Sequence, residues 1–286
     1  MQEFQWKTYQ LTSPKIRQES GTIRFCFLSD LHNSVFGEEN CRLIEAIHAH
    51  RPDGILVGGD MMISKSPVQF SVPFRLLREL ARDYPVWYAL GNHEYRLKYT
   101  PNRYTGEAYA PYEEELKSAG VHFLHNERDR MAIRGSRFAV YGLELEPDYF
   151  RKVLAPSLEV SHIQKLLSST APDEEEYSIL LAHSPRYGKT YFRWGCDLNL
   201  SGHYHGGIWR FSRHYGLAAP QDLLLPRYCC GDFKENGKTL LVSAGLGEHT
   251  LPLRINNPGK SWKLQYPEDS RRDFTKSFLA KYSSGK

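Results

Sequence analysis

The sequence of 286 residues has no apolar run that approaches the roughly 18 residues a helix needs to cross a membrane. Its first stretch, MQEFQWKTYQLTSPKIRQ, has neither the apolar core of a secretory signal nor a pair of adjacent arginines. Both absences argue against insertion into a membrane and against export. We therefore expect a chain without a membrane span.

Cysteine is scarce, and its arrangement argues against disulfide bonds. The five cysteines are Cys26, Cys41, Cys196, Cys229 and Cys230. No two of them form a CxxC pair, the count is odd, and the adjacent Cys229 and Cys230 are poor partners for each other. We expect reduced, mostly buried thiols and a cytoplasmic location.

A strong charge of either sign is also missing. The chain has 37 Lys and Arg against 33 Asp and Glu, a formal net charge of +4. This excess is too small to indicate a nucleic-acid partner, although it would not repel an anionic substrate. Hydrophobic residues make up 41% and charged residues 24%, so we expect a sizeable core. No repeat and no linker divides the chain, which favours one domain over residues 1–286.

Short apolar runs typical of buried strands alternate with helical patterns along the chain. In the first half, strands are predicted at 22–30, 53–60, 85–94 and from 121, and helices at 38–49, 71–83 and 112–120. In the second half, strands are predicted at 136–145, 177–184, 196–205, 238–247 and 251–258, and helices at 157–169 and after Pro185. Alternation followed by an excess of strands predicts an α/β fold with two sheets packed together and helices outside.

Polar groups follow five of these strands. The endings are Asp30-Leu31-His32, Gly58-Gly59-Asp60, Gly91-Asn92-His93-Glu94, Ala182-His183-Ser184 and His203-Tyr204-His205. Ligands of α/β proteins bind beyond the carboxyl ends of strands, so these groups can converge on one edge. Spacings of two residues, as in Asp30 and His32 or His203 and His205, point side chains the same way along a strand.

Each residue taken alone has a simpler interpretation. Asp30 or Asp60 could cap a helix, Asn92 could occupy a turn, and a single His183 is more often a buried structural histidine than a ligand. These interpretations are weakened because eight groups occur together at the expected endings: Asp30, His32, Asp60, Asn92, His93, His183, His203 and His205. Oxygen and imidazole donors without thiolates suit Mn, Fe, Zn or Co. Eight are too many for one ion and suit two divalent ions about 3.5–4 Å apart, bridged by a carboxylate.

The ordered series SDLH, GGD, GNHE, AHSP and SGHYHGG resembles the calcineurin-like metallophosphoesterases over roughly residues 23–210. The segment SAGLGEHTLPLRINNP is similar to the bacterial YkuE-type subgroup. The resemblance implies a four-layer sandwich of two mixed β-sheets. It also implies that one metal is held by Asp30, His32 and His205, a second by Asn92, His183 and His203, and both by Asp60. His93 would face the substrate, and the catalytic set would be His93, Asp60 and Asn92.

The activity implied is hydrolysis of phosphomonoesters or phosphodiesters in a small phosphorylated substrate. Hydroxide produced by the two metals would attack phosphorus in line, and His93 would give a proton or a hydrogen bond to the leaving group. The tyrosine-rich segment 95–112 is interpreted either as a lid or as a solvated surface loop. A strand-rich extension is expected after about residue 207, and the oligomeric state is left open.

Three other functions compete with this one. A protein Ser/Thr phosphatase is disfavoured because GGDMMISK lacks the GDxVDRG pattern. A pyrophosphate hydrolase acting on UDP-lipids or nucleotides would use the same site, although the polar 95–112 segment does not resemble an acyl-chain cap. A non-catalytic scaffold of the same fold predicts gaps in the metal set, and the sequence has none.

Overall fold

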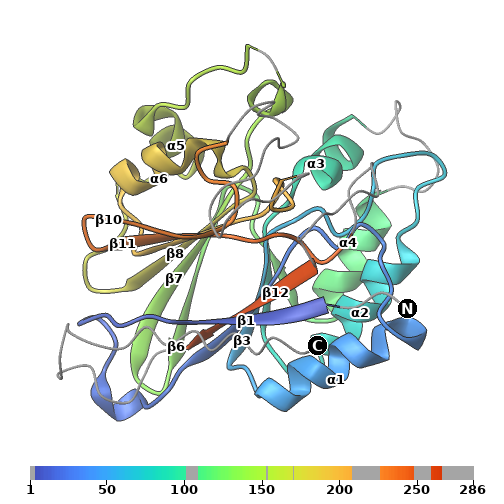
Figure 1. Cartoon of the computed structure of the whole chain (residues 1–286), viewed down its shortest axis with the longest axis horizontal. Coiled ribbons are helices and arrows are strands. Elements are labelled where there is room, and N and C mark those ends of the chain that lie inside the picture. The colour runs from blue at the N-terminus through green and yellow to red at the C-terminus, as the bar shows by residue number, and fades with distance from the viewer. Residues whose placement is uncertain are drawn as a thin grey trace, which may run out of the picture.

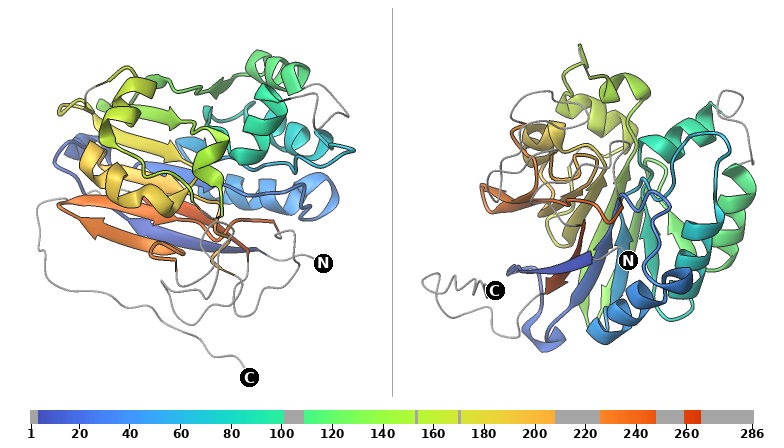
Figure 2. Two further views of the ribbon diagram at one scale, coloured as in Figure 1. Left: turned by 90° about the horizontal axis from the view of Figure 1, so that it is seen from above. Right: turned by 45° about the vertical axis from the view of Figure 1, so that its right-hand side comes forward.

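A computed structural model describes residues 4–100, 109–152, 154–169, 171–207, 226–247 and 259–265. Two six-stranded β-sheets face each other, and helices cover the outer side of each (Figures 1 and 2). Both sheets combine parallel and antiparallel pairs. The predicted α/β sandwich of two mixed sheets with helices outside is confirmed.

Sheet A contains, in spatial order, β1 (Phe4–Gln10), β12 (Gly259–Gln265), β2 (Arg24–Leu28), β3 (Gly54–Val57), β4 (Val86–Tyr88) and β5 (Val121–Phe123). Strands β2 to β5 are parallel, β12 is antiparallel to β2, and β1 is parallel to β12. The carboxyl ends of β2, β3 and β4 therefore share one edge of the sheet.

Sheet B contains β10 (Gly231–Glu235), β11 (Lys238–Val242), β9 (Leu198–Ser201), β8 (Tyr177–Ala182), β7 (Ser136–Leu143) and β6 (Arg128–Ile133). The four central strands are parallel, and β10 and β6 pair antiparallel at the edges. The central strands β8 and β9 thus also end side by side.

The alternation of side chains along β2 builds two different cores. Phe25 and Phe27 point between the sheets, where the Phe25 ring lies 5.5 Å from the ring of Phe138 on β7. Cys26 and Leu28 point the other way, beneath the helices. A period of two is what an extended strand imposes. Each buried phenylalanine stabilises the sandwich by about 1.5–3 kcal/mol.

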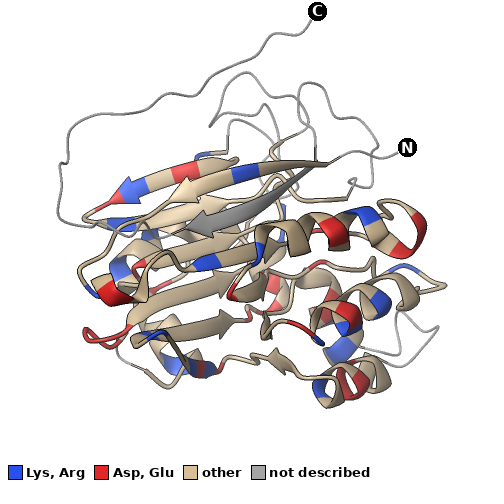
Figure 3. Cartoon of the chain, turned by 90° about the horizontal axis from the view of Figure 1, so that it is seen from below, with Lys and Arg blue, Asp and Glu red and all other residues tan. Residues whose placement is uncertain are grey.

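Helices α1 (Cys41–His50), α2 (Ser71–Leu80) and α4 (Tyr109–Ser118) pack on sheet A, and α5 (Val160–Leu166) and α6 (Gly188–Trp194) pack on sheet B. Helix α3 (Asn92–Tyr99) follows β4, and short 3-10 helices are η1 (Gln18–Ser20), η2 (Glu38–Asn40), η4 (Pro147–Phe150) and η5 (Pro185–Tyr187). In the part of the chain that the structure describes, no helix has the length and apolarity to span a bilayer. Acidic and basic residues are interspersed over the face shown in Figure 3.

Helix α2 illustrates why the sequence forms these elements. Its buried residues Pro73, Leu76, Leu77 and Leu80 recur at the spacing that places side chains on one face of a helix. The intervening residues are partly or fully exposed. The apolar stripe therefore fixes which face of α2 packs on sheet A.

Several predicted boundaries differ from the structure. The strand predicted at 85–94 ends at Tyr88, because Asn92 already begins α3. Of the predicted lid at 95–112, residues 95–99 belong to α3, residues 109–112 belong to α4, and 101–108 lie outside the described residues. Tyr109 and Tyr112 are buried in the core beneath the helices. A lid role for the rest of the segment stays a prediction.

Strands β1, β6 and β10 were not anticipated from the sequence. They lie at the sheet edges, and the side chains described in β6 alternate between exposed and partly buried, so their apolar signal is weak. The strand predicted at 251–258 lies outside the described residues. After residue 207, strands β10 and β11 extend sheet B, and β12 inserts between β1 and β2 in sheet A.

Candidate metal centre

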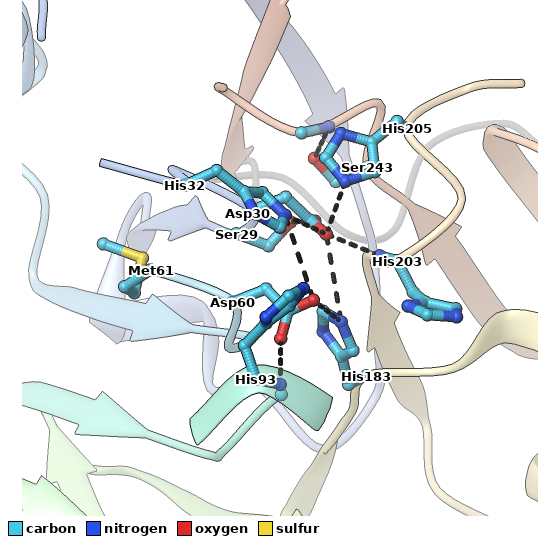
Figure 4. Close-up of polar contacts among 12 residues, drawn as sticks. Ser29, Asp30, His32, Asp60, Met61, His93, His183, His203, His205 and Ser243 are labelled. Carbon is cyan, nitrogen blue, oxygen red and sulfur yellow. Dashed lines mark hydrogen bonds and ion pairs between the residues drawn. The ribbon is translucent and has the colours of Figure 1, made fainter. Parts of the chain in front are cut away.

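The residues predicted for the metal site come from the five segments that follow β2, β3, β4, β8 and β9, with Asn92 and His93 at the start of α3. Figure 4 shows the carboxylates of Asp30 and Asp60 with the imidazoles of His32, His93, His183 and His205 gathered around them. Three overlapping groups could each hold an ion, with ligand atoms within 4.8 Å of one another. The groups are Asp30, His32 and His205; Asp60, His183 and His203; and His32, Asp60 and His93.

The backbone at this site is strained. Asp30, His32, Asp60, His203 and His205 all have positive φ angles, between 47° and 64°. Each such residue other than glycine costs on the order of 1–3 kcal/mol and persists only where the surroundings hold it. Backbone hydrogen bonds from Asp30 N to the carbonyl of Gly59, just after β3 (2.9 Å), and from His32 N to the carbonyl of Asp60 (3.1 Å) provide part of that support. Strain of this kind concentrates at functional sites.

Two glycines let the carboxylates lie directly against the backbone. A Cβ atom on Gly91 would come within 2.2 Å of Asp60 Oδ1, and one on Gly202 within 2.1 Å of Asp30 Oδ2. No side chain fits in either place. The glycines of GNHE and SGHYHGG are therefore required for close approach to the acidic groups, not for flexibility.

Hydrogen bonds fix the orientation of both carboxylates. Asp30 accepts from the hydroxyl of Ser29 at 2.6 Å and from the backbone N–H of His203 at 2.9 Å. Asp60 accepts from the backbone N–H of His93 at 2.9 Å. Asp30 is fully buried and Asp60 is 2% exposed. Two ionised carboxylates buried together need positive charge beside them.

Part of that charge comes from the histidines. Burial raises the pKa of Asp30 to about 6, although the nearby His183 acts in the opposite direction. Burial also favours the neutral form of Asp60, but the charges of His183, His93 and His32 outweigh it and hold the pKa of Asp60 well below its usual range. Burial would lower the pKa of His183, yet Asp60 and Asp30 together raise it to about 9. The pocket is therefore built to attract cations.

Imidazole nitrogens and carboxylate oxygens lie close enough together to share a bound ion. His183 Nε2 lies 2.9 Å from Asp60 Oδ2, His205 Nε2 lies 3.4 Å from Asp30 Oδ1, and His32 Nε2 lies 3.9 Å from Asp60 Oδ2. His183 Nε2 is buried and makes no hydrogen bond of good geometry to any described residue. Its other nitrogen, Nδ1, lies 2.7 Å from the carbonyl oxygen of Gly58. Because a carbonyl only accepts, Nδ1 carries a proton, which leaves Nε2 to bind an ion.

Asn92 lies among the same ligand groups. One end of its side-chain amide is 2.9 Å from His203 Nδ1 and 3.3 Å from Asp60 Oδ2. With the amide nitrogen at that end it donates hydrogen bonds to both atoms, and with the oxygen there it can bind a cation. The donor set of oxygens and imidazoles thus fits a divalent metal.

Glu94 supports the site from behind. It is fully buried and accepts hydrogen bonds from Asp60 N (2.9 Å), Met61 N (2.7 Å), Gly91 N (3.1 Å) and the hydroxyl of Tyr88 (2.8 Å). Burial, with the charge of Asp60, raises the pKa of Glu94 to about 7. Its carboxylate ties the loop after β3 to the loop after β4.

Replacing Glu94 by glutamine is expected to weaken metal binding by about 10–100-fold, the usual effect of losing a group that orients a ligand. An amide nitrogen would face backbone N–H groups that now find an acceptor. Metal content after dialysis against graded metal concentrations measures the change. Glu114→Gln, at an exposed position on α4, is the matched control. Unchanged metal affinity in Glu94→Gln would contradict the supporting role.

Phe150 and Ser64 complete the surroundings and were not singled out in the sequence. The ring of Phe150, in η4, lies 5.3 Å from the ring of His203 and 6.3 Å from that of His183. Ser64 contacts His93 Nδ1 through both its backbone nitrogen and its hydroxyl, each at 2.8 Å. Neither belongs to a short motif, so only the folded chain reveals them.

The model of one family, described as calcineurin-like phosphoesterase, matches residues 23–207. The chain belongs to this family. As a calcineurin-like phosphoesterase it is a hydrolase of phosphoric esters, and the family implies divalent metal ions. The resemblance predicted from the five motifs is confirmed at this level. Membership of the YkuE-type subgroup stays a prediction.

Individual relatives of this calcineurin-like phosphoesterase are distant. It is 26% identical over 257 residues to the uncharacterized protein YpbG of Bacillus subtilis (strain 168), covering 87% of this chain and 82% of that protein. It is 28% identical over 195 residues to phosphodiesterase YaeI of Escherichia coli (strain K12), covering 67% of this chain and 63% of that protein. A solved structure, phosphopantetheinyl hydrolase from Mycobacterium tuberculosis, is 16% identical with a TM-score of 0.44. The match covers 78% of this chain and 89% of that chain.

Proposed function

We propose that this enzyme hydrolyses the phosphomonoester or phosphodiester bond of a small substrate with two divalent ions, drawn from Mn, Fe, Zn and Co, held side by side. The observation that carries the proposal is the pair of ligand groups around Asp60. Asp30, His32 and His205 form one group that could hold an ion, and Asp60, His183 and His203 form another, beside the amide of Asn92. Asp60 lies within reach of both and is assigned to bridge them.

Bound divalent ions would supply Lewis acidity, which lowers the pKa of water and offsets the negative charge of a phosphoryl group. The chain's own residues prepare for that chemistry. The carboxylates of Asp30 and Asp60 are fixed by Ser29 and by backbone N–H groups, so little reorganisation is needed when charge develops. A phosphoryl group over the pocket would place its leaving oxygen toward His93, which lies beside Asp60 and His32.

The five cysteines support a cytoplasmic location as part of this proposal. None of the five forms a disulfide, and four of them are buried. Reduced thiols of this kind are usual in proteins of a reducing compartment.

Hydrolysis of bis-p-nitrophenyl phosphate tests the proposed function. Protein stripped with a chelator is expected to be inactive and to regain activity when Mn²⁺, Fe²⁺, Zn²⁺ or Co²⁺ is added. p-Nitrophenyl phosphate, a cyclic nucleotide and a nucleoside diphosphate derivative, run in the same series, separate monoester, diester and pyrophosphate specificity. Loss of release in His183→Ala under every metal is expected. Absence of metal-dependent release from all four substrates would overturn the proposal.

A further inference from the structure

We propose that the backbone N–H of Ser64 fixes the tautomer of His93, so that His93 serves the leaving oxygen as a neutral hydrogen-bond donor and not as an imidazolium acid. The tautomer follows from the hydrogen bonds alone. The catalytic part rests on the proposed function. It chooses between the two roles that the sequence left open for this histidine, proton donation and hydrogen bonding.

The hydrogen bond between Ser64 and His93 has only one possible direction. Ser64 N lies 2.8 Å from His93 Nδ1, and a backbone N–H can donate but never accept. A proton on Nδ1 would place two donors face to face. Nδ1 is therefore bare, and an imidazole with one proton carries it on Nε2. The hydroxyl of Ser64, also 2.8 Å from Nδ1, can rotate to donate as well.

The loop that carries Ser64 is held in place on both sides. Asn33 accepts from the backbone N–H of Ile63 at 3.1 Å and donates to the carbonyl of Gln69 at 2.6 Å. Glu94 holds the start of the same loop through Met61 N at 2.7 Å. The donor of Ser64 thus cannot turn away from the ring without breaking these bonds.

The opposite edge of the ring faces the site. His93 forms a group with His32 and Asp60 in which one atom of each lies within 4.8 Å of the others. The rings of His93 and His32 meet edge to face, with centroids 5.1 Å apart. Because Nδ1 is turned toward Ser64, Nε2 is the nitrogen on the side of the pocket. Its proton points where a substrate oxygen would lie.

His183 shows the contrary arrangement in the same pocket. Its Nδ1 faces the carbonyl of Gly58 and not an N–H, so its Nδ1 carries a proton and its Nε2 can bind an ion. The Nδ1 atom of His93 faces a hydrogen-bond donor, so its Nε2 keeps a proton and cannot bind a metal ion. The backbone group that contacts Nδ1 of each ring thus determines whether Nε2 can bind a metal: it can in His183 and cannot in His93. This criterion excludes His93 from the metal set although it lies within reach.

The consequence for the reaction is a defined path for each proton. Water attacks phosphorus and loses a proton to solvent, the bond from phosphorus to the leaving oxygen breaks, and the electron pair stays on that oxygen. Nε2–H of His93 hydrogen-bonds the developing negative charge and keeps its proton. The departing alkoxide takes its proton from solvent water. An oriented donor of this kind is worth about 10²–10³-fold in rate.

The ring nitrogens can be observed directly by long-range proton–nitrogen NMR on protein labelled with ¹⁵N-histidine. His93 is assigned from the signals missing in His93→Gln. In both the metal-free and the Zn²⁺-loaded protein, we expect an unprotonated Nδ1 and a protonated Nε2 for His93. Ser64→Ala keeps the backbone donor, so Nδ1 is expected to stay bare. A protonated Nδ1 in the wild-type protein would overturn the proposal.

Two substitutions at His93 test the role of the donor. The amide nitrogen of glutamine reaches the place of Nε2, whereas that of asparagine reaches only the place of Nδ1. With a diester that has an alkyl leaving group, His93→Gln is expected to retain at least about 10-fold more activity than His93→Asn. Equal losses would refute the neutral-donor role. If wild-type protein hydrolysed nothing, the proposed function would fail while the NMR result still decided the tautomer.

Discussion

Replacing Asp60 by asparagine is expected to remove bound metal and to reduce hydrolysis by on the order of 10³-fold or more, beyond the 10²–10³-fold typical of one lost donor. Asp60 joins two of the three candidate groups. Its Oδ2 lies 2.9 Å from His183 Nε2 and 3.9 Å from His32 Nε2. Removing its charge therefore weakens ion binding by both of the groups to which it belongs.

Asparagine is the sharpest substitution because it changes charge and leaves shape almost unchanged. Its oxygen can still accept from His93 N, as Asp60 Oδ1 does at 2.9 Å. Its amide nitrogen would instead present protons to the positions of the ions. Overpacking or a cavity therefore cannot explain a loss of metal. The metal content of the variant, by elemental analysis, should fall well below that of the wild type.

His93→Ala provides the comparison. It should retain the metal content of the wild type and lose about 10²–10³-fold in turnover of substrates with poor leaving groups, because it removes the oriented donor. A thermal unfolding midpoint close to that of the wild type for both variants would show that the fold survives. Full metal content in Asp60→Asn, or equal metal loss in His93→Ala, would contradict the assigned roles.

The residues of the candidate site could be predicted because their signals are local. A strand such as β2 is a short apolar run, and the side chains that follow it, Asp30 and His32, stand next to it in the sequence. Parallel strands end at one edge of a sheet, so motifs that each follow a strand are expected to lie together although they are far apart in the sequence. The same reasoning gave two sheets, because apolar strands that outnumber the helices need a second sheet to cover them.

The remaining features depend on long-range contacts. Strand β12 lies between β1 and β2, more than 200 residues away from both in the sequence, and no local pattern specifies that neighbour. The donor behind His93 belongs to Ser64, in a loop without a motif. The positive φ angles of residues such as Asp60 are imposed by surrounding hydrogen bonds, against the ordinary preference of the residue. Such features follow from the assembled fold.

Stability should depend on pH through a second polar cluster, which anchors the helix that begins at the site. His125 Nδ1 lies 2.7 Å from Glu144 Oε1, and its Nε2 lies 2.8 Å from Glu113 Oε1. Lys98 Nζ lies 2.7 Å from Glu113 Oε2, and the Tyr99 hydroxyl donates to Glu144 at 3.1 Å. Lys98 and Tyr99 are at the end of α3. The cluster therefore joins α3 to α4 and to the segments after β5 and β7.

His125 Nδ1 faces Glu144, and its Nε2 lies beside both Glu113 and the Lys98 ammonium, whose Nζ is 3.1 Å away. Burial opposes a charge on the ring, but the hydrogen bonds and charges of Glu113 and Glu144 raise the pKa of His125 to about 9 from an ordinary 6.5. The difference corresponds to about 3 kcal/mol of stability. Because the pKa is higher in the folded state, the contribution is complete below about pH 6.5 and is lost as the pH rises through about 9.

His125→Gln is expected to lower the free energy of unfolding by about 2–3 kcal/mol at pH 7 and by much less at pH 9.5. Urea unfolding of wild type and variant at both pH values measures the two differences. His122→Gln is the control, because His122 contacts Asp129 at 3.1 Å with half of its side chain exposed, and an exposed pair is worth at most about 1 kcal/mol. Equal destabilisation by His125→Gln at both pH values would show that lost packing, and not the charge of His125, accounts for the effect.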